Sequence, residues 1–291
     1  MRAFDFAVLM LCCLCWAGNF VVSSWAVGAH PVPPFMLAFI RSAIVLIFMF
    51  PFLFMKWPKR WWRLAIVCAC VGPIHLAFLY TGLQTAPASG SSIVSQMLIP
   101  LATILSVIFL RERVGWIRGL GIVGAFIGTI IMIYEPSALS FDVGLIYILC
   151  AYFSLAIGSV MMKTVGDVDW RQYVIWVAVM VFLFMGSASA LFEEGHAAIW
   201  QASKFPLLIA AGYAAIMVSV IAHGQYFKMI AKYDVSVVVP LTLMVPVFTC
   251  ILAVLLRGET IFPRYYVGAA LILPCVFIIA KRGKIAPVQE D

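Results

Sequence analysis

Long apolar runs follow one another along the whole chain, and no other feature of the sequence constrains the fold as strongly. Of the 291 residues, 65% are hydrophobic and 11% are charged, against about 25% charged residues in soluble domains. A soluble fold of this length cannot bury so much apolar surface. A helix that crosses a bilayer needs roughly 20 apolar residues, so the sequence predicts an all-α integral membrane protein with ten transmembrane helices.

Proline, glycine and charged residues separate the apolar runs, as expected of turns. The first run extends over about 22 residues, beyond the 7–15 of a signal peptide, and we assign it to a spanning helix. The predicted spans are residues 5–27, 34–55, 64–83, 87–110, 114–134, 143–163, 173–192, 206–228, 235–256 and 263–281.

Basic residues indicate how these spans are oriented. With the N-terminus in the cytoplasm, 15 Lys and Arg fall on the cytoplasmic side, 3 fall outside and Arg41 alone lies within a span. Cytoplasmic loops carry the excess of Lys and Arg in membrane proteins. The sequence therefore predicts a multi-pass protein of the cell inner membrane with both termini in the cytoplasm. These loops explain the net charge of +7, and nucleic acid is not an expected partner.

Two segments half a chain apart share a pattern. Residues 80–100 and 226–246 both run from Tyr to Pro over 20 positions, at an offset of 146. An apolar run that ends in a charged turn, FLRERV or LLRGET, follows each of them. The sequence therefore predicts two five-helix repeats, residues 1–141 and 142–282, and a short cytoplasmic tail, residues 283–291.

The odd number of spans in each repeat decides the topology. After five crossings the second repeat enters the membrane from the opposite side, so the two repeats are inverted. Inverted repeats are typical of transporters, in which the substrate site lies near the midplane between the halves and opens alternately to each side.

Several short patterns resemble the EamA-type, ten-span branch of the drug/metabolite transporter superfamily. They are Trp16-Ala17-Gly18-Asn19-Phe20, Ala38-Phe39-Ile40-Arg41, the mid-span Pro100 and Pro246, Leu110-Arg111-Glu112 and Leu256-Arg257-Gly258-Glu259. The sequence departs from the family at Ser42, where Phe is common, and at the L-G-E turns, of which one lacks Gly and one carries an extra residue. Known members export amino acids and other small metabolites. The resemblance implies an alternating-access exporter of amino acids or related zwitterions.

The fourth span carries the richest set of polar residues. Ser92, Ser95, Gln96, Ile99, Thr103 and Ser106 recur at steps of three and four residues, which places a mostly polar stripe on one helical face. We predict that this stripe lines a wet cavity; the alternative is hydrogen bonding between helices. Through the repeat, Gln96 corresponds to Thr242 and Thr103 to Thr249.

The first span presents Trp16, Asn19 and Ser23 on one face. Trp16 is a candidate for stacking on an aromatic or cationic substrate, with plain packing as the alternative, and Asn19 is a candidate for hydrogen bonding in the cavity. In the second repeat the corresponding span offers Tyr147, Ser154 and Gly158. Ser154 is the substrate-binding candidate among these.

Arg41 is the one charge away from the ends of a predicted span, and it lies roughly 10 Å deep at 1.5 Å per residue. Because arginine cannot be deprotonated, it needs a carboxylate, a carbonyl or water. One hypothesis is contact with the carboxylate of a substrate. The other is a structural anchor that reaches outward to the interface.

Two histidines and two tyrosines complete the substrate-binding candidates. His75 and His223 could carry a proton at physiological pH, although a lone membrane histidine is more often a neutral hydrogen-bonding residue. Tyr80 and Tyr226 occupy repeat-related positions.

Prolines and glycines have structural roles in the prediction. Pro100 and Pro246 each remove a backbone donor and kink a helix. Glycines at 115, 119, 124 and 128 have the spacing of close helix packing. We expect this packing within the monomer first and in a dimer second.

Absent residues also limit the function. All twelve carboxylates fall in loops or at the ends of spans, which disfavours proton antiport through a buried carboxylate. Phosphorylated substrates need several embedded cations, and Arg41 alone is thin support for them.

Two alternatives to the amino-acid exporter remain. A lipophilic drug-like or lipid-like substrate on the same fold is the first. The second is a membrane enzyme that modifies lipids, which needs a reactive cluster near an interface; the sequence offers neither paired carboxylates within helical reach nor metal-spaced His and Cys. We therefore expect no catalytic residue, no metal site and no cofactor. The expected partners are a small-molecule substrate and the lipid bilayer, for a monomer or homodimer.

Overall fold

A computed structural model describes residues 2–30, 32–55, 59–110, 115–135, 140–166, 168–233, 238 and 241–281 of the chain. The predicted tail, residues 283–291, lies outside this set. The only strands within these ranges are β1 (Tyr134–Glu135) and β2 (Ser140–Phe141), which pair antiparallel between the two halves of the chain.

The first half consists of five helical segments. They are α1 (Ala3–Ser24) with the π-helical η1 (Trp25–Ala29); α2 (Pro34–Met49) with the 3₁₀ helix η2 (Phe50–Phe54); α3 (Trp61–Ala69), the π-helical η3 (Cys70–Ile74) and α4 (His75–Gly82); α5 (Ala88–Val94), the 3₁₀ helix η4 (Ser95–Met97) and α6 (Leu98–Leu110); and α7 (Trp116–Ile133).

The second half repeats this order. Its segments are α8 (Val143–Met162); α9 (Trp170–Phe192); α10 (His196–Gly212), the π-helical η5 (Tyr213–Ala222) and α11 (His223–Lys232); α13 (Met244–Arg257); and α14 (Pro263–Lys281). Local sequence explains where several helices begin. Pro34 opens α2, and the carboxylates of Asp142 and Asp169 accept hydrogen bonds from the first turns of α8 and α9.

The length and composition of the helices confirm the predicted membrane class. Seven segments of the described chain are long and apolar enough to cross a membrane, and each lies where the sequence predicts a span. Shorter apolar helices within α7, α13 and α14 occupy the positions predicted for the fifth, ninth and tenth spans.

Helix contacts are related by exchange of the two halves. The first helix of each half packs on the third segment of the other, α1 on η5 and α11, and α8 on α3 and α4. The same two helices contact the fourth segment of the other half, α1 against α13 and α8 against α6. The second helices of the two halves, α2 and α9, pack on each other, and so do the fifth helices, α7 and α14. Exchange of the two halves leaves these two pairs unchanged. The bundle therefore has approximate two-fold symmetry.

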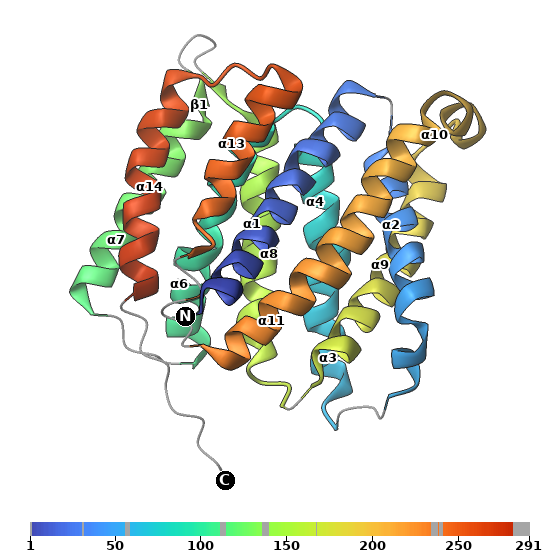
Figure 1. Ribbon diagram of the computed structural model, residues 1–291, viewed down its shortest axis with the longest axis horizontal. Helices are drawn as coiled ribbons and strands as arrows, with labels where there is room; N and C mark the ends of the chain where they lie inside the picture. Colours follow the sequence, from blue (N-terminus) through green and yellow to red (C-terminus); the bar gives the residue numbers. More distant parts are fainter. Residues whose placement is uncertain are drawn as a thin grey trace.

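Equivalent helices run in opposite directions. In Figure 1, α7 leads to β1 at the upper end of the bundle, whereas α14 descends from that end to the end where α1 begins. The start of α1 and the end of α14 lie at this lower end, which we call the N-terminal end.

Helix α7 packs on α14 through a face that carries glycines, while its large apolar side chains lie on another face and are exposed. Leu120, Val123 and Ile127 of α7 are exposed, while a Cβ added at Gly128 would lie 2.8 Å from the Ile272 side chain and 3.0 Å from the Gly268 carbonyl of α14. Gly124 likewise faces α14.

The other predicted glycine pair does not take part in this packing. A Cβ added at Gly115 or Gly119 would meet no atom within 4 Å. Gly121, outside the predicted spacing, faces α14 instead, with its added Cβ 3.0 Å from the Ile279 side chain.

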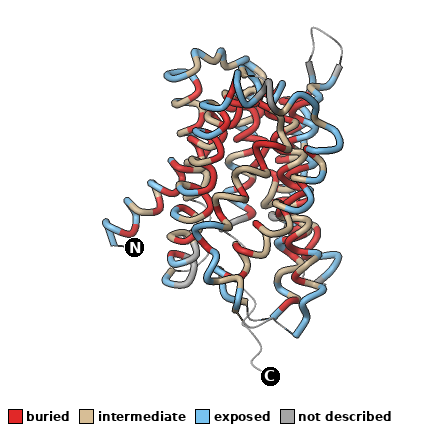
Figure 2. Tube along the Cα trace, turned by 90° about the vertical axis from the view of Figure 1, so that its right-hand side faces the viewer, coloured by how far each residue is buried: buried red, intermediate tan, exposed pale blue. Residues whose placement is uncertain are grey.

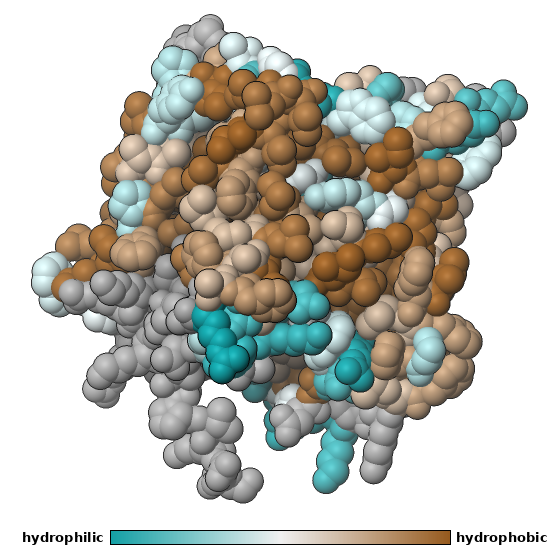
Figure 3. Space-filling view, viewed as in Figure 1, coloured by the Kyte–Doolittle hydropathy of each residue, from teal (hydrophilic) through white to brown (hydrophobic). Residues whose placement is uncertain are grey.

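The burial pattern and the surface agree with a bilayer environment. Buried residues concentrate between the helices and exposed residues cover the outside (Figure 2). The face in Figure 3 is mostly hydrophobic, with hydrophilic residues gathered toward the N-terminal end and at an upper corner. At the N-terminal end, Arg60 and Arg63 both donate to the carbonyl of Thr164 at 3.1 Å.

Candidate functional site

Arg41 lies on α2 and connects the two halves of the bundle. Its Nη1 donates to the Tyr80 hydroxyl of α4 at 2.9 Å, and its Nη2 donates to the Ser219 hydroxyl of η5 at 3.0 Å. We call Arg41, Tyr80 and Ser219 the Arg41 cluster. Arg41 and Ser219 are 178 positions apart in the chain. One side chain therefore bonds to both halves of the bundle.

Among the described residues, the charge of Arg41 has no acidic partner. Within the described part of the chain, its hydrogen bonds go to the two neutral hydroxyls alone. A guanidinium has five N–H donors, and a cation inside a membrane is costly unless it is paired. The Arg41 cluster is therefore suited to bind an anion, with a carboxylate as the group that best matches guanidinium geometry.

An aromatic group lies next to the Arg41 cluster, on the contact between α1 and α11. The Trp16 ring is 5.7 Å from the His223 ring and 5.1 Å from the Tyr226 ring, centroid to centroid. We call Trp16, His223 and Tyr226 the Trp16 cluster. All three side chains are partly exposed, so the cluster is not closed off by the protein around it.

The other half contains a related pair. The Tyr152 ring of α8 lies 5.3 Å from the His75 ring of α4 in a T-shaped arrangement. In both cases an aromatic residue on the first helix of one half contacts the first histidine after a π-helical segment of the other half, η3 before His75 and η5 before His223. Such π-helical segments are rare and occur often at functional sites.

The two histidines differ in their hydrogen bonds. His75 is 8% exposed, and its Nδ1 lies 2.9 Å from the Ala151 carbonyl of α8. His223 makes no side-chain hydrogen bond within the described residues. The positive charge of Arg41 lies close enough to interact electrostatically with the rings of His75 and His223. Six of the predicted residues thus lie together between the halves: Trp16, Arg41, His75, Tyr80, His223 and Tyr226.

Asn19 lies one helical turn beyond Trp16 on α1. Its Oδ1 accepts from the Ser23 hydroxyl at 3.5 Å, the outer limit of a hydrogen bond, and its amide nitrogen has no partner in the described chain. The side chain is partly exposed. Asn19 therefore keeps donors and an acceptor for a ligand or water.

The polar stripe of the fourth span is buried rather than open. Ser92, Ser95, Gln96, Thr103 and Ser106 are each at most 8% exposed. Four of them are hydroxyls that donate to carbonyls of their own segment at 2.6 to 2.9 Å. Such bonds satisfy the hydroxyl locally, so they do not require a wet cavity.

Gln96 is the exception in this stripe. Its amide makes no hydrogen bond within the described chain, and it lies in η4, four residues before Pro100. A proline removes the backbone donor that would bond to the fourth preceding residue. Pro246 likewise follows a turn, since α13 begins at Met244.

The remaining candidates lie apart from the central residues or are already bonded. The Ser154 hydroxyl donates to the Cys70 carbonyl of η3 at 2.7 Å. Thr103 donates to Ile99 of its own helix, and Thr242 is partly buried before α13, with a partner of its own.

Comparison with known proteins identifies the family. A model of the EamA-like transporter family matches residues 5–134 and 142–281. The chain belongs to the EamA-like transporter family. Its two matched segments both begin at an aspartate, Asp5 and Asp142, the first residues of two related halves.

Curated relatives extend over nearly the whole of this EamA-like transporter. A "probable amino-acid metabolite efflux pump" of Escherichia coli K12 is 27% identical over 286 residues, and one of Salmonella typhimurium is 28% identical over 290; 94% of each chain is covered in both comparisons. A solved crystal structure superposes with a TM-score of 0.63 over 96% of both chains at 18% identity, which supports the fold alone.

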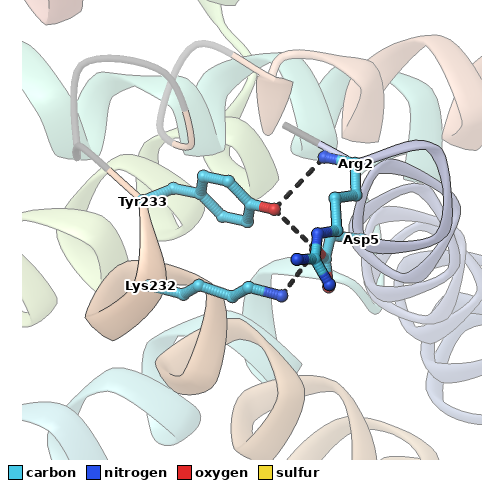
Figure 4. Close-up of polar contacts among 4 residues, drawn as sticks. All are labelled: Arg2, Asp5, Lys232 and Tyr233. Carbon is cyan, nitrogen blue, oxygen red and sulfur yellow. Dashed lines mark hydrogen bonds and ion pairs between the residues drawn. The ribbon is translucent and has the colours of Figure 1, made fainter.

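A polar cluster closes the N-terminal end of this EamA-like transporter (Figure 4). The Asp5 carboxylate of α1 accepts from the Lys232 ammonium at 2.7 Å and from the Tyr233 hydroxyl at 2.5 Å, both at the end of α11. The Tyr233 hydroxyl accepts from the Arg2 backbone N–H at 3.2 Å. We call these four residues the Asp5 cluster. Hydrogen bonding to Asp5 raises the pKa of Lys232, which keeps the ammonium charged.

Two carboxylates join the halves at the opposite end. Glu193, after α9, accepts from the backbone N–H groups of Phe35 and Met36 at the start of α2, at 2.7 and 2.9 Å. Glu259, after α13, accepts from the N–H groups of Ala88 and Ser89 at the start of α5, at 3.1 and 3.2 Å, and from the Ser89 hydroxyl. Carboxylates are favourable at helix N-termini.

A pocket of about 340 Å³ lies between α2, α9 and the start of α10. Its walls are mainly apolar, and its polar side consists of Ser189 and His196. The Ser189 hydroxyl lies 3.0 Å from Nε2 of His196. Sequence analysis did not identify this pocket, the Asp5 cluster or Tyr152. The residues that form each of these features are more than 150 positions apart in the chain or meet only through helix packing. A local sequence pattern therefore does not predict them.

Proposed function

We propose that this EamA-like transporter exports small zwitterionic metabolites, amino acids foremost, across the bacterial inner membrane by alternating access. The observation that carries the proposal is Arg41, a cation within a span whose partners in the described chain are two neutral hydroxyls, one on each half. A carboxylate supplied by the substrate completes this cluster, and no covalent chemistry is required.

The names of the relatives support the substrate class. Two relatives that cover 94% of the chain are described as probable amino-acid metabolite efflux pumps. A single guanidinium matches one carboxylate. A phosphorylated substrate calls for several cations, so the proposal excludes sugar phosphates.

Contacts between the halves at each end support alternating access. The Asp5 cluster joins α1 to α11 at the N-terminal end, and Glu193 and Glu259 cap helices of the other half at the opposite end. These polar contacts lie at the two ends, whereas α7 packs closely on α14 within the bundle, so the proposal has the ends separate while the α7–α14 packing is retained. Rocking of inverted repeats about a central site uses this geometry.

The charge distribution supports the orientation. Arg60, Arg63 and Lys232 lie at the N-terminal end of the bundle, together with the end of α14. Because cytoplasmic segments carry the excess of basic residues, this end faces the cytoplasm in the proposal.

Counterflow in proteoliposomes tests the substrate class. Vesicles loaded with a mixture of the twenty amino acids should exchange a subset of them. Arg41→Gln should reduce this exchange about tenfold or more, the size of a lost charge-assisted hydrogen bond, whereas Arg171→Gln at an exposed helix start should not. Unchanged exchange in folded Arg41→Gln protein would refute carboxylate binding at this residue.

The pocket between α2 and α9 favours a second candidate function, export of lipophilic compounds. Its walls are mainly apolar, and its volume of about 340 Å³ accommodates a small drug-like molecule. Inhibition of substrate binding by lipophilic cations but not by any amino acid would favour this function over the first.

A further inference from the structure

We propose that Asn19, Trp16 and His223 form a subsite for the ammonium group of the substrate. The site then recognises two charges at once, with the carboxylate on Arg41 and the ammonium on the α1–α11 side. This inference rests on the proposed function and deepens it, because it separates amino acids from plain carboxylic acids and from plain amines.

Helix geometry places the two subsites within reach of one small molecule. Ser219, which holds Arg41, is four residues before His223 on the same continuous segment. Four residues of α-helix rise about 6 Å, which is an upper bound for the π-helical turn between Ser219 and His223, and residues at this spacing lie on nearly the same face. His223 in turn contacts Trp16 of α1, with 5.7 Å between the ring centroids.

The atoms on the α1–α11 side are those that a cation needs. His223 and the indole N–H of Trp16 have no hydrogen-bond partner within the described residues, and Asn19 uses its oxygen in one long bond only. A neutral imidazole nitrogen and an amide oxygen accept hydrogen bonds from an ammonium, and the face of a tryptophan ring attracts a cation. Polar groups without partners in a membrane are costly, so a ligand that satisfies them is favoured.

The neighbouring charge of Arg41 provides discrimination. Arg41 is bonded to Ser219, four residues before His223 on the same segment, and like charges repel, so an amine alone is disfavoured at this subsite. A carboxylate alone satisfies Arg41 but leaves Asn19 and His223 without partners. Only a molecule that carries both groups neutralises Arg41 and places its ammonium against the neutral acceptors.

The related position in the other half is closed to such a ligand. His75 is bonded to the Ala151 carbonyl, and Ser154 is bonded to the Cys70 carbonyl. Tyr152, which covers the His75 ring, interacts with Ser95. The two-fold symmetry of the fold therefore does not produce two ammonium subsites. It leaves one, on the α1–α11 side.

Competition experiments on purified, reconstituted protein test the inference. For each amino acid that exchanges, two analogues are compared as inhibitors: the acid in which hydrogen replaces the amino group, and the amine in which hydrogen replaces the carboxyl group. The acid should inhibit at least about tenfold more weakly than the amino acid, and the amine should not inhibit at the same concentration.

Variants assign this discrimination to residues. In Asn19→Leu and in His223→Phe, the inhibitory concentrations of the amino acid and of its acid analogue should differ by no more than about twofold. Inhibition by the acid itself should be retained. His30→Gln, directly after η1 and outside both clusters, is the matched control and should keep full discrimination. If one of the two subsite variants does not fold, the other still gives the answer.

The results separate this inference from the proposed function. Equal inhibition by amino acid and acid in the wild-type protein, with dependence on Arg41, overturns the ammonium subsite and leaves carboxylate transport intact. Full discrimination in both folded variants overturns the assignment to Asn19 and His223. Loss of dependence on Arg41 refutes the proposed function, and the ammonium subsite with it.

Discussion

The Asp5 carboxylate and the Lys232 ammonium lie 2.7 Å apart and join the first helix of one half to the third segment of the other. Asp5 is 7% exposed and Lys232 is 47% exposed at the side chain, so the pair lies at the edge of the buried interior. Three turns further along α1, Trp16 contacts His223 on the same helix pair. In the proposed alternating-access cycle, opening of the N-terminal end would separate this ion pair, because it joins the same two helices as the Trp16 cluster.

Asp5→Asn should weaken the contact between α1 and α11. The substitution keeps the shape of the side chain and removes its charge, so we expect a small loss of stability, limited by solvent screening of the exposed ammonium. Thermal unfolding of Asp5→Asn, Lys232→Met and the double variant measures the coupling energy as a double-mutant cycle. Additive effects of the two substitutions would show that the pair does not stabilise this end.

The reactivity of Lys232 should depend on Asp5 and on pH. Because the hydrogen bond to Asp5 raises the pKa of Lys232, the ion pair is fully formed at neutral pH and is lost only as the pH rises through the raised pKa. An amine-selective reagent should therefore modify Lys232 more slowly in the wild-type protein than in Asp5→Asn as the pH is increased. Lys228, an exposed lysine of the same helix, is the internal reference. Equal rates in both proteins would contradict the prediction.

The membrane class and the approximate spans could be predicted from the sequence, because both depend on the summed hydrophobicity of consecutive residues. Apolar runs of about 20 residues have few alternatives to a spanning helix. The offset between Tyr80 and Tyr226 likewise identified two related halves, because repeats preserve spacing. The family match over residues 5–134 and 142–281 and the symmetric helix contacts agree with this.

The partners of individual side chains could not be predicted in the same way. The stripe from Ser92 to Ser106 has the periodicity of a cavity wall, but its hydroxyls are satisfied by carbonyls of their own segment. Periodicity gives the face of a helix and not what that face meets. Asp5 and Glu193 appear in the sequence as ordinary charges at span ends, and their partners follow only from the helix packing.

Gly128→Ala should destabilise the contact between α7 and α14. The added Cβ would lie 2.8 Å from the Ile272 side chain and 3.0 Å from the Gly268 carbonyl, and the carbonyl cannot move without shifting the helix. Overpacking of this kind costs about 1–3 kcal/mol. Gly119→Ala on the same helix meets no atom within 4 Å and should have no such cost. Thermal unfolding in detergent compares the two variants, and equal midpoints would contradict the close packing at Gly128.

Gln96→Leu should separate stability from transport. Gln96 is 8% exposed and its amide has no hydrogen-bond partner in the described chain, so no hydrogen bond to these residues is lost with the amide. Removal of the amide should therefore leave the unfolding temperature unchanged or raise it. If Gln96 contacts the substrate, as its place in the polar stripe predicts, amino-acid exchange should fall at the same time.

Ser92→Ala provides the control for this measurement. Ser92 lies on the same face one turn earlier, and its hydroxyl already donates to the Ser89 carbonyl at 2.8 Å, so its loss should not change exchange. A variant that is less stable and equally active would mark Gln96 as a structural residue, because the amide would then stabilise the bundle without meeting the substrate. Higher stability together with slower exchange is the combination expected of a binding residue, since binding sites retain groups that the folded protein alone does not satisfy.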